Sequence, residues 1–506
     1  MFTEKRSASI FRSSGQGEEH QIGMMNRISA VLAIAAVVPC LLAAGGFFSS
    51  FSLSDRRGSF SSGRHSTKEE DFIFPDEALP TKSGYFPVGD GVSTKMFYSY
   101  YESIEPISSL SETPLILWLQ GGPGCSSMTG NFYEFGPWRT APDLQLHKNP
   151  HPWNQRFGIL FIDNPVGTGY SIAEKDEDIP TDQDQVVAHL YSALSSFFDA
   201  DPVLKRRPFF IAGESYAGKY VPALGHHIMK IMERGRSSGF LVRELHQHGE
   251  MGDLKGHTYA FRLDGLIIGN GLTDPKVQVQ THAETAYNFG LIDKNQRAYV
   301  DELAKHVVQL VEKEEWYAAY KARTALVDWI QNVSGLATPL DVRRTVPYHC
   351  GQDGTEFLRQ FLNRKAVKAA LKAEDKAFWI HCNPRVRRIM AVDTMKSVKW
   401  MVDDLLPKLP LLLFQGQYDI KDGVASSEEW MRTLTWHGRE AFFETQRSLW
   451  WVGKTLAGYW RSFDTLSHVV VVGAGHQVPA DQGLTSQHMI EKWIAHVLST
   501  RSSLPK

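Results

Sequence analysis

A serine at the tip of a tight turn is the sequence feature that most constrains the fold of this chain. The apolar run 208–212 (PFFIA) leads directly into residues 213–218 (GESYAG). This order predicts a buried strand, a sharp turn with Ser215 at its apex, and a helix that begins immediately afterwards. Small residues flank the turn because its backbone is crowded. Such a turn holds the serine oxygen clear of the sheet and lets the next backbone N–H point at an oxyanion.

The groups that would activate this serine lie further along the chain. A serine hydroxyl becomes a good nucleophile only beside a histidine that takes its proton, and a carboxylate must orient that histidine. Two later apolar runs end in turns that carry Asp419 and His476. Serine, aspartate and histidine in this order are typical of α/β-hydrolases, which place such groups at the carboxyl ends of their strands. The sequence therefore predicts Ser215, Asp419 and His476 as a catalytic triad, with Asp422 as the rival for the acid role.

The alternation of apolar strand patterns with helical patterns indicates the fold class. It predicts an α/β-hydrolase fold with a central, mostly parallel sheet and helices on both faces. A chain of 506 residues, 42% of them hydrophobic, can bury the large core that this fold needs. Residues 235–257 are polar and rich in glycine, histidine and charged side chains, so we expect them to form a surface loop.

Composition and short motifs argue against several other functions. The formal net charge is -2 and no basic block dominates, so we expect no nucleic-acid partner. The glycine-rich loop at 121–124 lacks the lysine and serine of a phosphate cradle. Zinc-ligand spacings and dinucleotide fingerprints are not evident either. We therefore expect neither a metal ion nor a cofactor.

Four longer motifs occur in a fixed order along the chain: 120–127 (QGGPGCSS), 164–171 (NPVGTGYS), 268–275 (IGNGLTDP) and 474–479 (AGHQVP). They resemble the motifs of the serine carboxypeptidases, and most closely those of the vitellogenic-like branch. The resemblance extends over most of the chain. It implies one hydrolase domain over residues 71–500, with a helical cap inserted at about 283–344.

The resemblance also assigns roles to residues near the serine. The backbone N–H groups of Gly122 and Tyr216 would form an oxyanion hole, while Gln120, Glu134 and Glu214 would bind the free carboxylate of a peptide substrate. Most family members have asparagine at position 120, whereas the vitellogenic-like branch has glutamine. Two glutamates can hold an anion only while repulsion and burial keep at least one of them protonated. We therefore expect activity to be favoured at acid pH.

The four cysteines are few for a secreted chain of this length. Cys125 and Cys382 match family positions that form a disulfide. Cys40 lies in an apolar segment, which leaves Cys350 as a buried free thiol. Asn332 begins the one glycosylation sequon that we find, and it falls within the expected cap.

The N-terminus carries the information on compartment. Residues 1–27 form an extension, and residues 28–48 contain no charged side chain, which is typical of a signal peptide or of a membrane anchor. Small residues near the end of that segment favour a cleaved signal. The serine-rich segment 49–70 reads as a flexible linker or pro-segment. We expect a vacuolar, lysosome-like or extracellular protein, with contact to membranes only if the anchor is retained.

The function implied by the resemblance is that of a serine carboxypeptidase, which releases C-terminal residues from peptides and proteins through an acyl-enzyme. Its partners would be peptides with a free C-terminus. An acyltransferase or esterase could use the same triad with another acceptor, and a non-enzymatic protective role for a partner protein is the third alternative.

Overall fold

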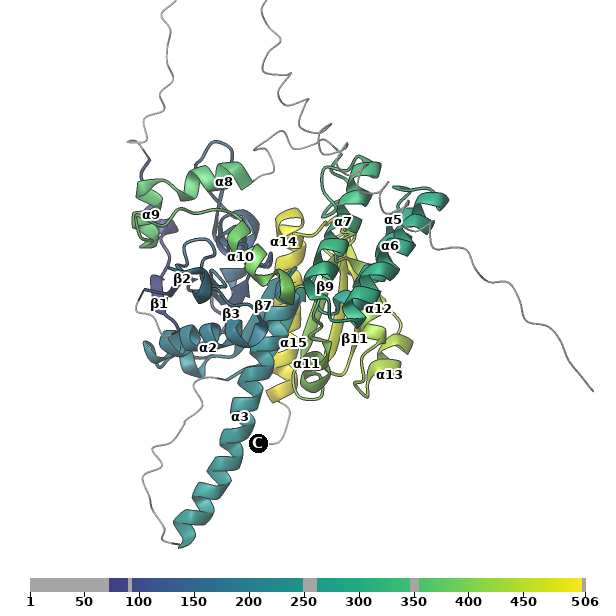
Figure 1. Cartoon of the computed structure of the whole chain (residues 1–506). Coiled ribbons are helices and arrows are strands. Elements are labelled where there is room, and N and C mark those ends of the chain that lie inside the picture. The colour runs from purple at the N-terminus through teal and green to yellow at the C-terminus, as the bar shows by residue number, and fades with distance from the viewer. Residues whose placement is uncertain (1–71, 90–92, 249–261, 346–354, 503–506) are drawn as a thin grey trace, which may run out of the picture. The chain divides into compact units, whose positions relative to one another are not determined.

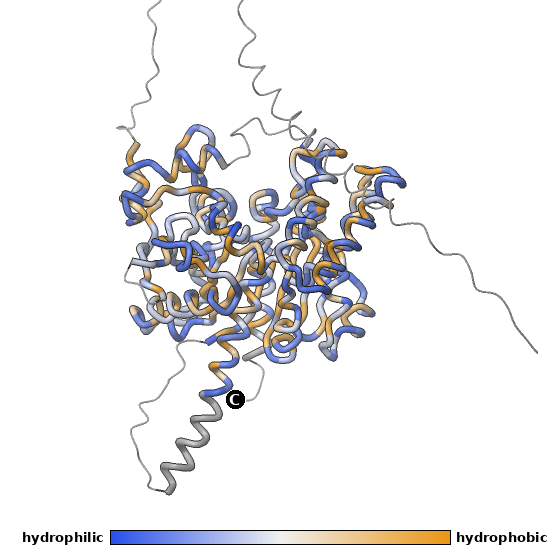
Figure 2. The backbone as a smooth tube through the Cα atoms, in the orientation of Figure 1, coloured by the Kyte–Doolittle hydropathy of each residue, from blue (hydrophilic) through white to orange (hydrophobic). Residues whose placement is uncertain are grey.

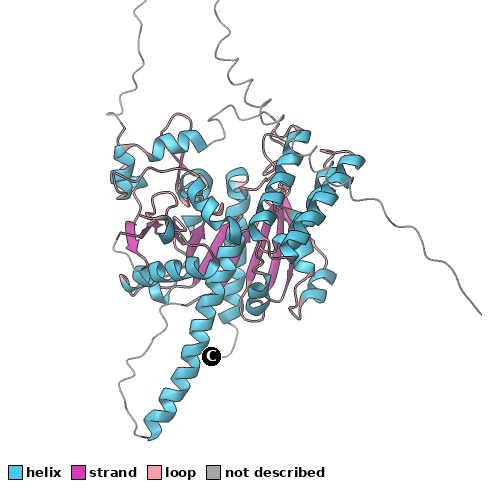
Figure 3. Cartoon of the chain, in the orientation of Figure 1, coloured by secondary structure: helices cyan, strands magenta, loops and turns pink. Residues whose placement is uncertain are grey.

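One ten-stranded sheet runs through the described part of the chain (Figure 1, Figure 3). The computed structural model describes residues 72–89, 93–248, 262–345 and 355–502. The strands of the sheet are β1 (Lys82–Pro87), β2 (Lys95–Tyr101), β3 (Leu115–Leu119), β6 (Gly158–Ile162), β7 (Phe209–Glu214), β8 (Gly265–Gly269), β9 (Leu411–Gly416), β10 (Ser448–Val452), β11 (Thr455–Phe463) and β12 (Leu466–Val471). They lie in the order β1-β2-β6-β3-β7-β8-β9-β12-β11-β10, and β4 (Trp138–Thr140) pairs with β5 (Leu146–Lys148) in a separate small sheet.

The centre of the sheet is parallel and its edges are antiparallel. Parallel pairing joins β6, β3, β7, β8, β9 and β12. Every residue of β3 is buried, as expected for a strand that is covered on both faces. Leu115, Leu117 and Leu119 enter one hydrophobic cluster, whereas Ile116 and Trp118 enter the other, because side chains alternate along a strand. The predicted central, mostly parallel sheet is confirmed.

Helices cover both faces of this sheet. The cluster that contains Leu115 receives residues from α2 (Gln183–Asp199), α3 (Ala217–His248), α11 (Lys399–Leu405) and α12 (Val424–Arg432). The cluster that contains Trp118 receives residues from α8 (Thr355–Leu362), α9 (Lys365–Leu371) and α15 (Gly483–Ser502). The remaining short helices near the sheet are α10 (Pro384–Ile389), α13 (Arg439–Glu444) and α14 (Val478–Asp481). Two packed faces on one sheet complete the α/β arrangement predicted from the sequence.

A group of helices follows β8 and has a core of its own. It consists of α4 (Pro275–Gln278), α5 (His282–Asn288), α6 (Lys294–Glu312) and α7 (Trp316–Ser334), in the region where the sequence predicts a helical cap. Asp293 caps α6 by accepting hydrogen bonds from two backbone N–H groups, and Gly335 ends α7 in the left-handed conformation. Hydrophobic and hydrophilic residues alternate along these helices (Figure 2). Their buried side chains form the third hydrophobic cluster.

The prediction of a surface loop over residues 235–257 is wrong for its first part. Residues 235–248 continue α3, which begins directly after the serine turn (Figure 1). Each residue added to an existing helix gains a hydrogen bond without a new nucleation step, so the helix extends through glycines that look like loop signals in the sequence. The rest of that segment lies outside the described residues.

Several further predictions also lie outside the described residues. These are the N-terminal extension, the apolar segment 28–48, the linker 49–70, and Cys350. Among the residues that are described, no helix combines the length and the apolar character that a membrane span needs.

Candidate active site

The predicted site residues gather where the chain changes direction across the sheet. From β3 the chain moves to β6 on one side, and it then returns to β7 on the other side of β3. Loops that leave such neighbouring strands diverge and open a crevice at the carboxyl ends of the strands. Gly122 follows β3 and Ser215 follows β7. Asp419 and His476 follow β9 and β12, which are themselves a parallel pair.

The turn at Ser215 is strained and firmly held. Ser215 has φ 63°, in the left-handed region that residues other than glycine rarely adopt. Its N–H donates to Gly269 O (2.9 Å), and its carbonyl accepts from the N–H groups of Gly218 and Leu272 (both 2.9 Å). A Cβ at Gly121 would lie 2.5 Å from Tyr216 N, so the loop after β3 can approach the turn this closely only with glycine. The surrounding backbone therefore fixes a serine conformation that the chain alone disfavours.

Asp419 and His476 form a buried hydrogen-bonded pair. His476 Nδ1 lies 2.5 Å from Asp419 Oδ2, and Asn270 Nδ2 donates to the same oxygen at 2.7 Å. The other oxygen, Oδ1, accepts from the N–H of Lys421 at 2.8 Å. The rival acid, Asp422, instead forms a buried ion pair with Arg323 of α7, whose Nη2 lies 3.0 Å from Asp422 Oδ1. The carboxylate on His476 is thus the one that the sequence predicts.

Asn270 is a contact that the sequence analysis did not single out. It lies just after β8, between the strands that lead to Ser215 and to Asp419. Its side chain holds Asp419 through Nδ2, while its Oδ1 accepts from Gly416 N at 3.1 Å. The sequence did contain a signal for Asn270, because this residue belongs to one of the four family-like motifs and follows an apolar strand.

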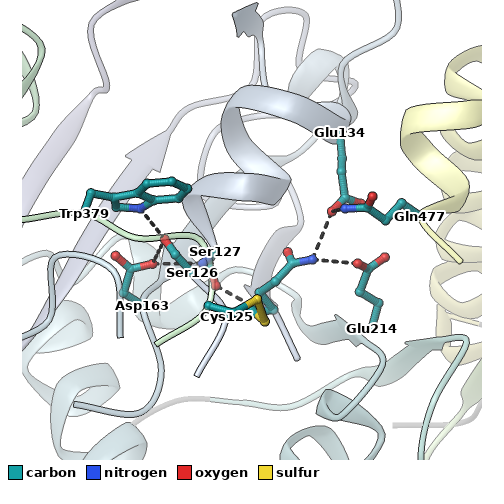
Figure 4. Close-up of a disulfide and its surroundings, with 10 residues drawn as sticks. Cys125, Ser126, Ser127, Glu134, Asp163, Glu214, Trp379 and Gln477 are labelled. Atoms are coloured by element: carbon teal, nitrogen blue, oxygen red, sulfur yellow. Dashed lines mark hydrogen bonds between the residues drawn. A yellow bond between two sulfur atoms is a disulfide. The ribbon is translucent and has the colours of Figure 1, made fainter. Parts of the chain in front are cut away.

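Gln120, Glu134 and Glu214 meet in one buried cluster beside the disulfide (Figure 4). Gln120 Nε2 donates to Glu134 Oε1 (3.0 Å) and to Glu214 Oε1 (2.6 Å). Trp118 Nε1 donates to Gln120 Oε1 at 2.9 Å, which fixes the orientation of the amide. Gln477, the residue after His476, also donates to Glu134 Oε1 (3.3 Å). Three segments that are far apart in the sequence thus supply one polar cluster.

The two carboxyl groups of this cluster favour their protonated forms. Burial raises the pKa of Glu134 to about 7. Burial and the nearby charge of Glu134 raise the pKa of Glu214 well above its ordinary value. Desolvation and like-charge repulsion both disfavour the ionised carboxylate. The two glutamates also interact with each other through a side-chain hydrogen bond, as expected when one of them keeps its proton.

Gly122 and Tyr216, with backbone N–H groups on two different loops, line one cavity together with Ser215. Within the described ranges neither N–H donates a hydrogen bond. Gly122 has φ 113°, a conformation open to glycine, and a Cβ there would lie 2.7 Å from Cys125 N. The structure therefore brings two available donors near Ser215, on the loops that follow β3 and β7.

The Tyr216 side chain is anchored by a buried ion pair that the sequence analysis did not identify. Tyr216 Oη donates to Asp393 Oδ2 at 2.5 Å, and Lys219 Nζ lies 2.7 Å from the same oxygen. Gln183 Nε2 also donates to it at 2.7 Å. Neither Asp393 nor Lys219 belongs to a recognised motif, and they lie 174 positions apart. Only the tertiary structure therefore reveals the ion pair between them.

A disulfide joins Cys125 to Cys382, as the family resemblance implies. The two residues are 257 positions apart in sequence. The loop that carries Cys125 is also held by Asp163, whose carboxylate accepts from Ser126 Oγ (2.6 Å) and from Ser127 N (2.9 Å), as Figure 4 shows in part. Burial raises the pKa of Asp163 to about 6. The loop after β3 is thus fixed by a covalent bond and by a buried carboxyl group.

Two cavities meet at Ser215, and both are also lined by Gly122, Arg387 and Lys421. The first has a volume of about 280 Å³ and contains Gln120, Glu214, His476 and Gln477. The second has a volume of about 190 Å³ and contains Tyr216, Leu272, Tyr320, Arg323, Thr324 and Asp328. Cavities of this kind, beside a residue in a strained turn, are typical of binding sites.

Asn332 lies on α7, the helix from which residues in the range 320–328 line the second cavity. It belongs to the last turn of α7 and is exposed. An exposed asparagine of this kind is sterically open to a glycan.

Comparison with known proteins identifies the family. The family model described as serine carboxypeptidase matches residues 74–496. The chain belongs to the serine carboxypeptidase family. Serine carboxypeptidase-like 50 of Arabidopsis thaliana is 44% identical over 83% of this chain and 89% of its own length. The probable serine carboxypeptidase CPVL of Homo sapiens is 30% identical over 83% of this chain and 84% of its own length.

A solved structure supports the fold. A prohormone-processing carboxypeptidase of Saccharomyces cerevisiae, Kex1Δp, superposes with a TM-score of 0.71 at 22% identity. It covers 84% of this chain and 93% of its own. The family and the α/β-hydrolase fold predicted from the sequence are therefore both confirmed.

Proposed function

We propose that this protein is a serine-type carboxypeptidase in which Ser215 is the nucleophile. The observation that carries the proposal is the hydrogen-bonded Asp419–His476 pair, which lines one cavity through His476 together with Ser215 and the Gln120 cluster. A nucleophile, a base held by a carboxylate, and a group of donors for an anion are the three parts that this reaction needs.

In the first step the Ser215 Oγ–carbonyl bond forms as the serine proton passes to His476 Nε2. The N–H groups of Gly122 and Tyr216 stabilise the negative charge that develops on the carbonyl oxygen. The C–N bond then breaks, and His476 returns the proton to the leaving amine, which departs as the C-terminal residue. Water, activated by the same histidine, then hydrolyses the acyl-enzyme and regenerates the serine. Asp419 keeps the imidazole oriented through Nδ1.

The carboxylate of the substrate would lie beside Gln120, Glu134 and Glu214. A protonated glutamate can donate a hydrogen bond to it, whereas an ionised glutamate repels it. Glu134, with its pKa raised to about 7, holds its proton below that pH and loses it above. Binding of a free C-terminus should therefore weaken as pH rises through 7, which supports an enzyme that works best at acid pH.

We also propose a route through the secretory pathway to a vacuolar, lysosomal or extracellular space. The observed disulfide supports it, because disulfides persist mainly in oxidising compartments. The exposed sequon at Asn332 is compatible with this route.

The proposed activity is tested by digestion of an unbiased peptide library, followed by mass spectrometry. We expect ladders shortened one residue at a time from the C-terminus. The Ser215→Ala variant provides the control. Products that are esterified or transferred to an added alcohol in place of shortened peptides would identify an acyltransferase instead.

A further inference from the structure

The two cavities have different tasks if Ser215 attacks a peptide from its C-terminal end. The substrate carboxylate is one residue beyond the scissile carbonyl, so the departing residue occupies the cavity that contains Gln120 and Glu214. We call this the leaving-side cavity. The residue that becomes bonded to Ser215 must then project into the other cavity, between Tyr216 and the cap helix α7. We call this the acyl-side cavity.

The acyl-side cavity contains more positive than negative groups. Arg323, Arg387 and Lys421 line it, against Asp328 and Asp422. Arg387 and Lys421 lie where the two cavities meet and line the leaving-side cavity as well. Arg323 and Asp422 neutralise each other in a buried ion pair at 3.0 Å. Asp328 is an exposed residue of α7 and lies within electrostatic reach of Lys421, without an ion pair between them. One surplus cation therefore remains beside Ser215.

Neither Arg387 nor Lys421 has an acidic partner within 4.0 Å among the described residues. By contrast, Arg385 and Arg388, on the same short helix as Arg387, both pair with Asp176. Burial lowers the pKa of the Lys421 ammonium, and the nearby charges of Asp422 and Asp419 offset this only in part. Arg387 is exposed and Lys421 is half-buried, and a cation without a close counter-ion attracts an anion that enters its cavity.

We propose that the acyl-side cavity selects substrates with an acidic side chain at the penultimate position, and that Arg387 and Lys421 are the residues that determine this preference. The inference rests on the proposed carboxypeptidase function and specifies its substrate class. A glutamate or aspartate side chain would supply the counter-ion that these two groups lack. Hydroxyls of the same cavity, on Tyr320 and Thr324, can bind the remaining carboxylate lone pairs.

The test measures kcat/KM at pH about 5.5 for N-blocked dipeptides with C-terminal leucine and penultimate glutamate, glutamine or lysine. At this pH the glutamate side chain is ionised, because its ordinary pKa is about 4.3. We expect glutamate to exceed glutamine by about tenfold, with lysine slowest, as charge complementarity favours one sign and rejects the other. The glutamine peptide is the reference for each enzyme, so only the ratio of rates is compared.

Substitutions test which residues determine the preference for penultimate glutamate. Arg387→Gln and Lys421→Met should each lower the glutamate-to-glutamine ratio several-fold. Arg388→Gln, which removes a neighbouring arginine outside both cavities, should leave the ratio unchanged. Asp328→Asn should raise it, because this change removes the opposing charge.

The outcomes distinguish this inference from the proposed function. Cleavage of all three peptides without a preference for glutamate would overturn the inference alone, whereas no cleavage of any peptide would overturn the carboxypeptidase activity. If Arg387→Gln slowed the glutamate and glutamine peptides equally, and their amides less, the cations would serve the C-terminal carboxylate and the inference would be wrong.

Discussion

The two cavities that meet at Ser215 share Arg387 and Lys421 but differ in their other charged groups. The leaving-side cavity uses buried glutamates, which can bind a carboxylate only while protonated. The acyl-side cavity is not lined by a glutamate, and besides the two shared cations it has Arg323, which is paired with Asp422. A site that depends on protonated acids gains pH sensitivity, whereas a guanidinium donates at any physiological pH. We therefore expect the glutamates of the leaving-side cavity to be the main source of pH dependence in substrate binding.

The walls of the two cavities are also fixed by different means. The leaving-side cavity is bordered by the Cys125–Cys382 disulfide. Beneath Tyr216, on the acyl side, a buried Lys219–Asp393 ion pair has the supporting role. A disulfide acts largely through the unfolded state, whereas a buried ion pair depends on both partners being present in the folded state.

The largest expected effect is the loss of activity when Ser215, where the two cavities meet, or His476 is replaced. Ser215→Ala or His476→Ala should lower kcat/KM on peptides by about 10⁴-fold or more, since the members of a triad act as one unit. An organophosphate should label the native enzyme and should fail to label Ser215→Ala. Labelling that survives Ser215→Ala would assign the nucleophile to another residue. Circular dichroism checks that both variants are folded.

The next largest expected effect concerns the buried Lys219–Asp393 ion pair, which lies beneath Tyr216 on the acyl side. Lys219→Met removes the cation from Asp393 and leaves a buried negative charge, which should lower the free energy of unfolding by about 3 to 5 kcal/mol. The double variant Lys219→Met, Asp393→Asn should recover much of that loss. Urea unfolding of the purified domain measures both.

The matched control for this experiment is Lys276→Met, which removes a lysine from the exposed ion pair with Glu312. Exposed pairs contribute about 0 to 1 kcal/mol. Equal effects of the two lysine variants would show that the buried pair is no more important than a surface pair.

The Cys125–Cys382 disulfide, which borders the leaving-side cavity, should contribute slightly less to the free energy of unfolding than the Lys219–Asp393 pair. The double variant Cys125→Ser, Cys382→Ser should lower the free energy of unfolding by about 2 to 4 kcal/mol. Because these residues lie on the leaving side, KM for free-acid peptides should rise more than KM for their amides. Equal changes in KM for both substrates would remove the link between the disulfide and that cavity.

The smallest expected effect directly tests the difference in pH dependence. As pH rises through about 7, the glutamate pair loses its first proton, and the charge left on Glu134 or Glu214 repels the substrate carboxylate. Glu134→Gln and Glu214→Gln keep a donor at all pH values, so activity on free-acid peptides at pH about 8 should rise roughly tenfold relative to the native enzyme at that pH.

The amide of the same peptide provides the reference for that experiment. It carries no charge at its C-terminus, so its activity should persist towards neutral pH in the native enzyme. At low pH both substrates should slow together, because His476 must be neutral to accept the serine proton. Superimposable profiles for acid and amide would exclude the glutamate pair from substrate binding.

The sequence predicted the parts of this protein that depend on local pattern. Ser215 could be identified because a strand, a tight turn and a helix leave a contiguous signature, and the fold followed from the alternation of apolar strands with helices. The same local reasoning failed at 235–248, where glycines suggested a loop but α3 continues. A helix already nucleated and packed overrides weak local preferences.

Only the tertiary structure decided which distant groups meet. The sequence favoured Asp419 but left Asp422 as a rival, and their neighbours in space separate the two: His476 for the first and Arg323 for the second. The raised pKa of Glu134 and the pairing of Lys219 with Asp393 likewise depend on burial and distance. Backbone conformation is set by a few consecutive residues, whereas electrostatic energies depend on separation and on the loss of water, which the folded chain alone determines.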